Sequence, residues 1–253
     1  GTGGLRDLHL IGWLGKLVCG SSDPSRMQAD GLLDPSEVLA LAAARACLFR
    51  IRYGLHLVAQ RAEDRLLFDH QRQLATLLGY RDERADNLGV EQCMQAYYRA
   101  VRCVAAINSE LLVLCDERLN PQQNDVVALG NGLLRVGDGL DVEPGCSLHQ
   151  DPKALVALFA ELASGNGVRR LRANALRQLR LALDDPQLDF NHPDVLVEVR
   201  NIFLRGAAAV DALAAMARHG VLARIIPGFA RVSGRMQYDL FHVYTVDEHT
   251  MRV

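Results

Sequence analysis

Apolar residues recur at intervals of three and four along most of the chain, which is the spacing of one face of an α-helix. In residues 5–18, Leu5, Leu8 and Ile11 keep this spacing, followed by Gly12 and Gly15. The same pattern predicts long helices over residues 34–61 and 88–118, with a shorter one over 69–78 that ends at Gly79. Long antiparallel helices with short connections form bundles. We therefore expect a mainly α fold, a multi-helix bundle.

Several predicted helices begin with a capping residue followed by proline, which is favoured at the first helical position. The four capping residues are Asp23, Asp34, Asp151 and His192. Asp34 and Glu37 also have the spacing of a capping box. Short helices are expected at about 152–164, 171–184, 193–205 and 208–219. We expect three glycines to form their C-caps: Gly165, Gly206 and Gly220.

Residues 120–145 break the helical pattern. Val126–Leu129 and Leu133–Val136 flank the turn-forming sequence Gly130-Asn131-Gly132, which predicts one small β-hairpin. An isolated hairpin is only marginally stable in water. This hairpin is therefore expected to pack on the helices.

Composition narrows the class of protein. Of 253 residues, 49% are hydrophobic and 23% charged, as in soluble globular proteins, and the net charge of -2 gives no global attraction to nucleic acid or membrane. No apolar run is long enough to span a bilayer, and the first residues do not form a signal peptide. The six cysteines include no CxxC pair, which favours free thiols in a reducing cytoplasm. Because there is no initiator Met, and the last residues continue a helical pattern, we expect a piece of a longer polypeptide.

The first candidate for chemistry is Asp7, which follows the pair Gly3-Gly4 in the first turn of the first predicted helix. A carboxylate held in this way can bind a hard cation such as Mg²⁺. A carboxylate in a first turn also stabilises the helix by itself, because it accepts from free N–H groups and opposes the helix dipole. The residues alone favour the capping role.

Two groups of arginines need anionic partners. The first lies along and after the helix over 34–61, beside its apolar stripe: Arg45, Arg50, Arg52, His56, Arg61 and Arg65. The anionic partners could be phosphates of a ligand or carboxylates of this chain. Pairing with Glu63, Asp64 or Asp69 is slightly favoured. The second group contains Arg169, Arg170, Arg172, Arg177 and Arg180. It has the charge to bind nucleic acid, but no aromatic residues are interleaved with it, so a solvated face or an acidic neighbour within the protein is favoured.

His242 and His249 would share one helix face, with Asp247 and Glu248 beside them. They could ligate a metal only if further residues completed the shell.

Together, several motifs resemble one family. They are Gly3-Gly-Leu-Arg-Asp-Leu8, Phe49-Arg-Ile-Arg52, Asp64-Arg-Leu-Leu-Phe-Asp69, Met94-Gln-Ala-Tyr-Tyr98, and above all the stretch from Met236 through Asp239 to Thr250. In collinear order they resemble the bacterial PII uridylyltransferase/uridylyl-removing enzymes. These are modular proteins with a nucleotidyltransferase domain, a helical domain, an HD-type phosphohydrolase domain and two glutamine-sensing ACT domains.

The resemblance implies a segment of such an enzyme, divided as follows: residues 1–20, the edge of the nucleotidyltransferase domain; 21–119, a long-helix bundle; 120–145, a β-hairpin insertion; 146–235, a short-helix subdomain; and 236–253, the start of the HD domain. The partners implied are UTP, the PII protein and, through the absent ACT domains, glutamine. Nucleic acid and membrane are not expected partners. The segment alone is expected to be inactive.

The resemblance also implies roles for single residues. Asp7 would be the third catalytic carboxylate and a Mg²⁺ ligand, and His249 the first histidine of a divalent-metal site in the HD domain. Substrate-binding candidates are Arg6, Arg50, Arg52, Arg61 and Arg65. Two alternatives stay open, a segment of a glutamine synthetase adenylyltransferase and a non-catalytic helical scaffold that binds a protein. The adenylyltransferases share a similar GG-x-RD signature but have no counterpart to Tyr244–Thr250.

Overall fold

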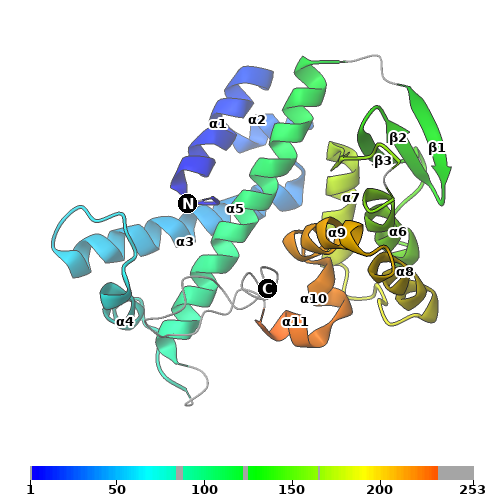
Figure 1. Ribbon diagram of the computed structural model, residues 1–253. Helices are drawn as coiled ribbons and strands as arrows, with labels where there is room; N and C mark the ends of the chain where they lie inside the picture. The colour runs from blue at the N-terminus through cyan, green and yellow to red at the C-terminus, as the bar shows by residue number, and fades with distance from the viewer. Residues whose placement is uncertain (1, 84–87, 122–124, 165, 233–253) are drawn as a thin grey trace. The chain divides into compact units, whose positions relative to one another are not determined.

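The structure is a computed structural model that describes residues 2–83, 88–121, 125–164 and 166–232 (Figure 1). It is mainly helical with one small sheet, so the expected fold class is confirmed. The described residues divide into two compact units, which meet within one helix between residues 112 and 113. Among the described residues, unit 1 contains those up to Leu112 together with Val232, and unit 2 runs from Val113 to Arg231.

Unit 1 is built from helices, and the four longer ones have bounds within about two residues of those expected from the sequence pattern. They are α1 (Leu5–Cys19), α2 (Pro24–Ala29), α3 (Pro35–Ala59), α4 (Phe68–Leu77) and α5 (Gly89–Leu119), the last of which continues into unit 2. Their shared interior contains the apolar positions that set the pattern, among them Ile11, Leu48, Leu74 and Ile107, each at most 5% exposed. The periodicity therefore identified the buried faces correctly.

The predicted capping box at the start of α3 is present. The Asp34 carboxylate accepts from the Glu37 N–H at 2.9 Å, and the Glu37 carboxylate accepts from the Asp34 N–H at 2.6 Å. Glu37 is almost completely buried. Asp23 likewise caps α2 by accepting from the Ser25 N–H at 3.0 Å.

Unit 2 contains a four-stranded sheet in the order β1-β2-β3-β4. The predicted hairpin is its first half, β1 (Val126–Gly130) and β2 (Leu133–Val136), joined at Asn131 with φ of 53°. The sheet extends beyond the predicted hairpin, because β3 (Gly139–Val142) pairs antiparallel with β2, and β4 (Arg170–Leu171) pairs parallel with β3. A two-residue strand carries no period that a sequence pattern could reveal.

Helices cover this sheet and form the rest of unit 2. They are α6 (Pro152–Leu162), α7 (Ala173–Asp184), α8 (Pro193–Phe203), α9 (Ala207–Arg218), α10 (Val221–Ile225) and α11 (Pro227–Val232), whose last residue lies beyond the unit. α6 is its centre: it packs against α8 and α9, and every residue from Ala154 to Ala160 is buried. Asp151 and His192 cap α6 and α8 as expected. The short helices α10 and α11 were not predicted.

One expectation about glycines is corrected. Gly206 does not end α8, whose C-cap is Leu204; it is the N-cap of α9, with φ of 61°. Gly220 follows the C-cap of α9, His219, and is itself the N-cap of α10. Gly165 lies outside the described residues. A glycine between two helices can serve either one, and the sequence does not say which.

The second arginine group is held by carboxylates of the same unit. Arg172 Nη2 lies 3.2 Å from Glu117 Oε2, and Arg172 Nε lies 3.3 Å from Asp141 Oδ2 without hydrogen-bond geometry. All three side chains are at most 20% exposed. Arg170, at 43% exposed, pairs with Asp138 at 3.1 Å and Asp116 at 3.5 Å. The acidic neighbours expected from the sequence are therefore present for these two arginines.

Replacing Arg172 is expected to destabilise unit 2. Arg172→Ala leaves the half-buried carboxylates of Glu117 and Asp141 without their cation, a loss of about 2–3 kcal/mol. Arg170→Ala is the matched control, because an exposed ion pair contributes at most about 1 kcal/mol. Hydrogen–deuterium exchange over β3 and α7 measures the difference. Equal protection in both variants would show that burial of the Arg172 network does not matter.

A partly buried histidine makes unit 2 sensitive to acid. His219 lies beside the Phe159 ring, with 6.4 Å between ring centroids. Burial, with a smaller effect of the neighbouring Arg218 charge, lowers the pKa of His219 from 6.5 to about 4. The folded unit therefore holds this imidazole neutral at pH values where an unfolded chain would protonate it.

Stability should consequently fall on acidification. The folded-state pKa of His219 is below its unfolded value, so the unfolded chain binds the extra proton as pH drops from about 6.5 to about 4. This lowers the free energy of unfolding by about 3 kcal/mol at pH 4. His219→Gln cannot take up this proton. Wild type should lose more stability than His219→Gln between pH 7 and pH 4, measured by urea unfolding followed by circular dichroism. Both proteins share the same carboxylates, so any difference between their pH profiles of stability comes from His219. Parallel profiles would contradict the lowered pKa of His219.

Candidate functional site

The Gly3-Gly4 turn and Asp7 form one local structure at the start of α1. Gly3 has φ of 79°, in the left-handed region that glycine tolerates best. Its N–H donates to Asp7 Oδ2 at 2.5 Å, while the Asp7 N–H donates to the Gly4 carbonyl at 3.0 Å. Asp7 is half-buried. The carboxylate thus stabilises the turn, as the capping interpretation expects, and its second oxygen, Oδ1, is a further acceptor.

Gly3 also lies directly against the backbone of α5. A Cβ added at Gly3 would lie 1.9 Å from the carbonyl oxygen of Val101. On the same stretch of α5, the Ala96 carbonyl lies 3.9 Å from the Cys47 thiol of α3. The start of α1 and the middle of α3 therefore both pack on the segment of α5 between Ala96 and Val101. This packing fixes the position of the Asp7 carboxylate relative to α3 and α5.

The first arginine group lies where α3 ends and the connection to α4 begins. Arg52 holds Asp64 with a two-pronged contact, Nε to Oδ1 at 2.7 Å and Nη2 to Oδ2 at 3.1 Å. His56 Nε2 is 3.5 Å from the same Oδ1. The hydrogen bond from Arg52 lowers the pKa of the Asp64 carboxyl, which keeps it ionised.

Glu63 serves the next two arginines. Its Oε2 accepts from Arg61 Nη2 at 2.7 Å, and its Oε1 accepts from the backbone N–H of Arg65 at 2.9 Å. The N–H of Arg65 and then the side chain of Arg61 lower the pKa of the Glu63 carboxyl. The intramolecular pairing favoured from the sequence is therefore seen for Arg52 and Arg61. Any phosphate that used these guanidinium groups would have to compete with Glu63 and Asp64.

Arg50 has a different task. Its Nη2 donates to the Leu78 carbonyl at 2.6 Å, so it satisfies a free carbonyl at the end of α4.

Burial raises the pKa of the neighbouring Cys93 thiol to about 11, so this buried cysteine is protonated and unreactive at neutral pH. Arg6 is exposed.

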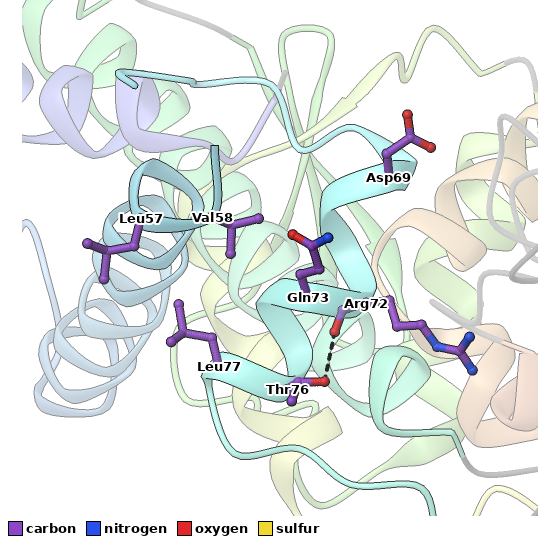
Figure 2. Close-up of a pocket in the computed structure, with 7 residues that line it drawn as sticks. All are labelled: Leu57, Val58, Asp69, Arg72, Gln73, Thr76 and Leu77. Atoms are coloured by element: carbon purple, nitrogen blue, oxygen red, sulfur yellow. Dashed lines mark hydrogen bonds between the residues drawn. The ribbon is translucent and has the colours of Figure 1, made fainter. Parts of the chain in front are cut away.

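Near this arginine group, a groove separates the end of α3 from α4 (Figure 2). Its volume is about 650 Å³, and its lining residues are Leu57, Val58, Asp69, Arg72, Gln73, Thr76 and Leu77. Figure 2 shows Leu57 and Val58 on the α3 side and the polar residues on α4. The helices approach closely below it because Gly54 has no side chain; an added Cβ would lie 2.7 Å from Leu74 Cδ1. The sequence did not predict this groove, since it depends on the crossing of two helices.

The expected metal ligands are only partly described. His249 lies outside the described residues, as do His242, Asp247 and Glu248. Among the residues that the structure does describe, no three His, Cys, Asp or Glu side chains come together as a metal site. Asp7 is therefore placed as a single carboxylate, which could ligate a metal only with groups from elsewhere.

Comparison with known proteins shows similarity to one group of enzymes. The profile of the family described as GlnD PII-uridylyltransferase matches residues 1–112. Over the whole chain, 42% of residues are identical to the bifunctional uridylyltransferase/uridylyl-removing enzyme of Xanthomonas campestris pv. campestris (strain B100). The corresponding enzyme of Pseudomonas aeruginosa (strain LESB58) is 36% identical over 99% of the chain. The chain is therefore similar to these enzymes along nearly its whole length.

The resemblance inferred from the sequence motifs is thereby confirmed. The chain spans 29% of the Xanthomonas uridylyltransferase and 28% of the Pseudomonas one, so it corresponds to less than a third of either. The family profile ends at residue 112, where the first stretch of unit 1 also ends. No solved structure matches the chain. Within the described residues, no helix is both long and apolar enough to cross a membrane.

The contact between Gly3 and α5 gives a direct test of the local structure. Gly3→Ala forces a side chain into the Val101 backbone and into a left-handed conformation, so unit 1 should lose about 3 kcal/mol of stability. Gly4→Ala is the control, since Gly4 has φ of -85°. Trp13, the single tryptophan of the chain, lies on α1, and its fluorescence during urea unfolding measures both. Equal midpoints for the two variants would contradict the close approach.

Proposed function

We propose that this chain is the central helical segment of a bifunctional enzyme that uridylylates the PII regulatory protein with UTP and removes the uridylyl group by hydrolysis. The observation that carries the proposal is its 42% identity, over its full length, to an enzyme with this double name. In this proposal, residues 1–20 are the edge of the nucleotidyltransferase domain, and residues 236–253 begin the HD domain. Glutamine would act through ACT domains that this segment does not contain.

Asp7 is the proposed catalytic residue of this segment. Its carboxylate fits a magnesium ligand, because Gly3 holds Oδ2 in place and Oδ1 is a free-standing acceptor on a half-buried side chain. Two more carboxylates, from the preceding part of the enzyme, would complete the site. Bound Mg²⁺ would neutralise phosphate charge and orient the triphosphate of UTP for in-line attack by a hydroxyl of PII. The contribution of this chain is to hold the Asp7 carboxylate rigidly against α5.

The arginines differ in how readily they could bind the triphosphate of UTP. Arg52 and Arg61 already bind carboxylates, so their use on the triphosphate of UTP requires exchange of Asp64 or Glu63 for phosphate. Arg6 and Arg65 have exposed side chains. Arg6 would not have to exchange Glu63 or Asp64 for phosphate. Arg50, bound to the end of α4, would act by locking the helices. His249 is the proposed first histidine of the divalent-metal site in the HD domain.

Substitution of Asp7 in the complete enzyme tests the proposal. Asp7→Asn keeps an acceptor for the Gly3 N–H but removes the negative charge that Mg²⁺ needs, so uridylyl transfer to PII should fall at least about a hundredfold. Removal of uridylyl from modified PII should persist. Asp23→Asn, at a cap of α2, is the control and should leave both activities near wild type. Transfer by Asp7→Asn within a few-fold of wild type would limit Asp7 to capping.

The isolated chain provides a second check on the same proposal. With UTP, Mg²⁺ and PII it should give no uridylylated PII, because a single carboxylate cannot assemble the catalytic metal site. Mass spectrometry of PII detects the added group. Transfer by this chain alone would contradict the assignment as a segment that depends on the rest of the enzyme.

A further inference from the structure

The outward face of α1 carries large apolar side chains that unit 1 does not cover. Trp13 and Leu17 are each 64% exposed. They lie four residues apart, so they are neighbours on one face of the helix. The buried residues of α1 lie on the other face, at Ile11, Leu14 and Gly15. An exposed tryptophan beside an exposed leucine is typical of a surface that contacts a partner.

Other helices of unit 1 occupy the inner side of α1. A Cβ added at Gly15 would lie 2.6 Å from Met27 Sδ of α2, which lies beside α1 in Figure 1. A Cβ added at Gly3 would lie 1.9 Å from the Val101 carbonyl oxygen of α5. Helix α1 also contacts α3. A partner of α1 therefore has the Trp13 face available to it.

The exposed polar side chains around Trp13 are basic. Arg6, His9 and Lys16 lie seven and four residues before Trp13 and three residues after it, which places them around the ring. None of the three forms an ion pair with a residue that the structure describes. Within α1 the one carboxylate is Asp7, which accepts from a backbone N–H of its own turn. The face thus fits a surface that is apolar at its centre and acidic at its edge.

Charge argues against a second copy of this chain on this face. A two-fold interface joins the same patch of both copies. The cations Arg6 and Lys16 of one copy would then meet those of the other, with no carboxylate on the face between them. Such juxtaposition of like charges disfavours association.

The proposed role of Asp7 identifies the partner, so this inference rests on the proposed function. Mg²⁺ binds oxygen ligands at about 2.0–2.1 Å, so two carboxylates from the preceding part of the enzyme would lie within about 4 Å of the Asp7 oxygen. Trp13 follows Asp7 by six residues, which is about 9 Å along the helix axis. An interface of standard size, about 800 Å² per partner, extends about 16 Å from its centre. A domain that reaches Asp7 is therefore large enough to cover Trp13.

We propose that the α1 face around Trp13 is the surface on which the preceding, nucleotidyltransferase part of the enzyme packs. Trp13 and Leu17 are its apolar anchors, and acidic residues of the preceding part face Arg6 and Lys16. This packing places the Asp7 carboxylate opposite the two remaining carboxylates of the metal site. Trp13 is thus a positioning residue for uridylyl transfer that does not itself contact UTP.

Photo-cross-linking in the complete enzyme tests where this face lies. The photoreactive amino acid p-benzoylphenylalanine is introduced in place of Trp13, and cross-linked peptides are identified by mass spectrometry after digestion. Irradiation should join position 13 to peptides that precede Gly1, within one molecule and independently of protein concentration. This measurement does not depend on either enzymatic activity.

Substitution of Trp13 in the complete enzyme tests its positioning role. Trp13→Glu removes the apolar anchor and sets a carboxylate against an acidic surface, so uridylyl transfer to PII should fall about tenfold or more. Removal of uridylyl from modified PII should persist. Trp13→Phe is the matched control, because it keeps an apolar ring at the same position, and its transfer should stay within about threefold of wild type.

The outcomes separate this inference from the proposed function. Cross-links that form only between two molecules would identify a second copy on this face and overturn the proposal. It would also be overturned if no peptide preceding Gly1 were cross-linked, or if Trp13→Glu transferred uridylyl like wild type, even where Asp7→Asn abolishes transfer. Cross-links to the preceding part together with full transfer by Asp7→Asn would retain the docking surface and reject the metal role of Asp7.

Discussion

The packing of Gly3 on the backbone of α5 is the constraint on which the start of this chain depends. A backbone that approaches the Val101 carbonyl so closely leaves no room for a Cβ, and the φ of 79° at Gly3 suits glycine for the same position. The turn orients the Gly3 N–H toward Asp7, so the carboxylate is fixed by the same contact that fixes the helix. Structural capping and a role in chemistry are thus compatible at Asp7, because the hydrogen bond uses one carboxylate oxygen.

Charge balance within each unit is the second organising feature. In unit 1, Glu63 and Asp64 neutralise arginines at the end of α3, and the depressed pKa values of both carboxyls keep this balance at neutral pH. In unit 2, the half-buried Arg172 joins Glu117 of α5 to Asp141 of β3. These pairs neutralise Arg52, Arg61 and Arg172 locally. They also mean that an anionic ligand would gain only the difference between phosphate and carboxylate binding.

The extent of the family match parallels the division of the fold. The family profile covers the first stretch of unit 1, up to Leu112, whereas the similarity to the individual uridylyltransferases extends over the whole chain. Unit 2 contains a feature with its own physical consequence, the acid-sensitive, partly buried His219. This feature does not depend on the arrangement of the two units.

The linear sequence was enough to predict the mainly α class, the bounds of the longer helices, the capping box at Asp34 and the resemblance to the uridylyltransferases. Each of these features depends on residues that are close in the sequence: the helix period, the four residues of a capping box, or a run of motif residues. It also named Glu63 and Asp64 as possible partners of the arginines, because they are near in sequence. The hairpin was predicted for the same reason, from its turn residues.

Contacts between segments that are distant in the sequence became visible only in the folded protein. It paired β4 with β3, brought Glu117 to Arg172, placed Gly3 on Val101 and opened the groove between α3 and α4. It also showed that Arg224 donates to the carbonyls of Asp185 and Leu188 and lies over the Phe190 ring. Such contacts depend on how helices and strands cross, which is set by the packing of many side chains at once. No local pattern in the sequence records that geometry.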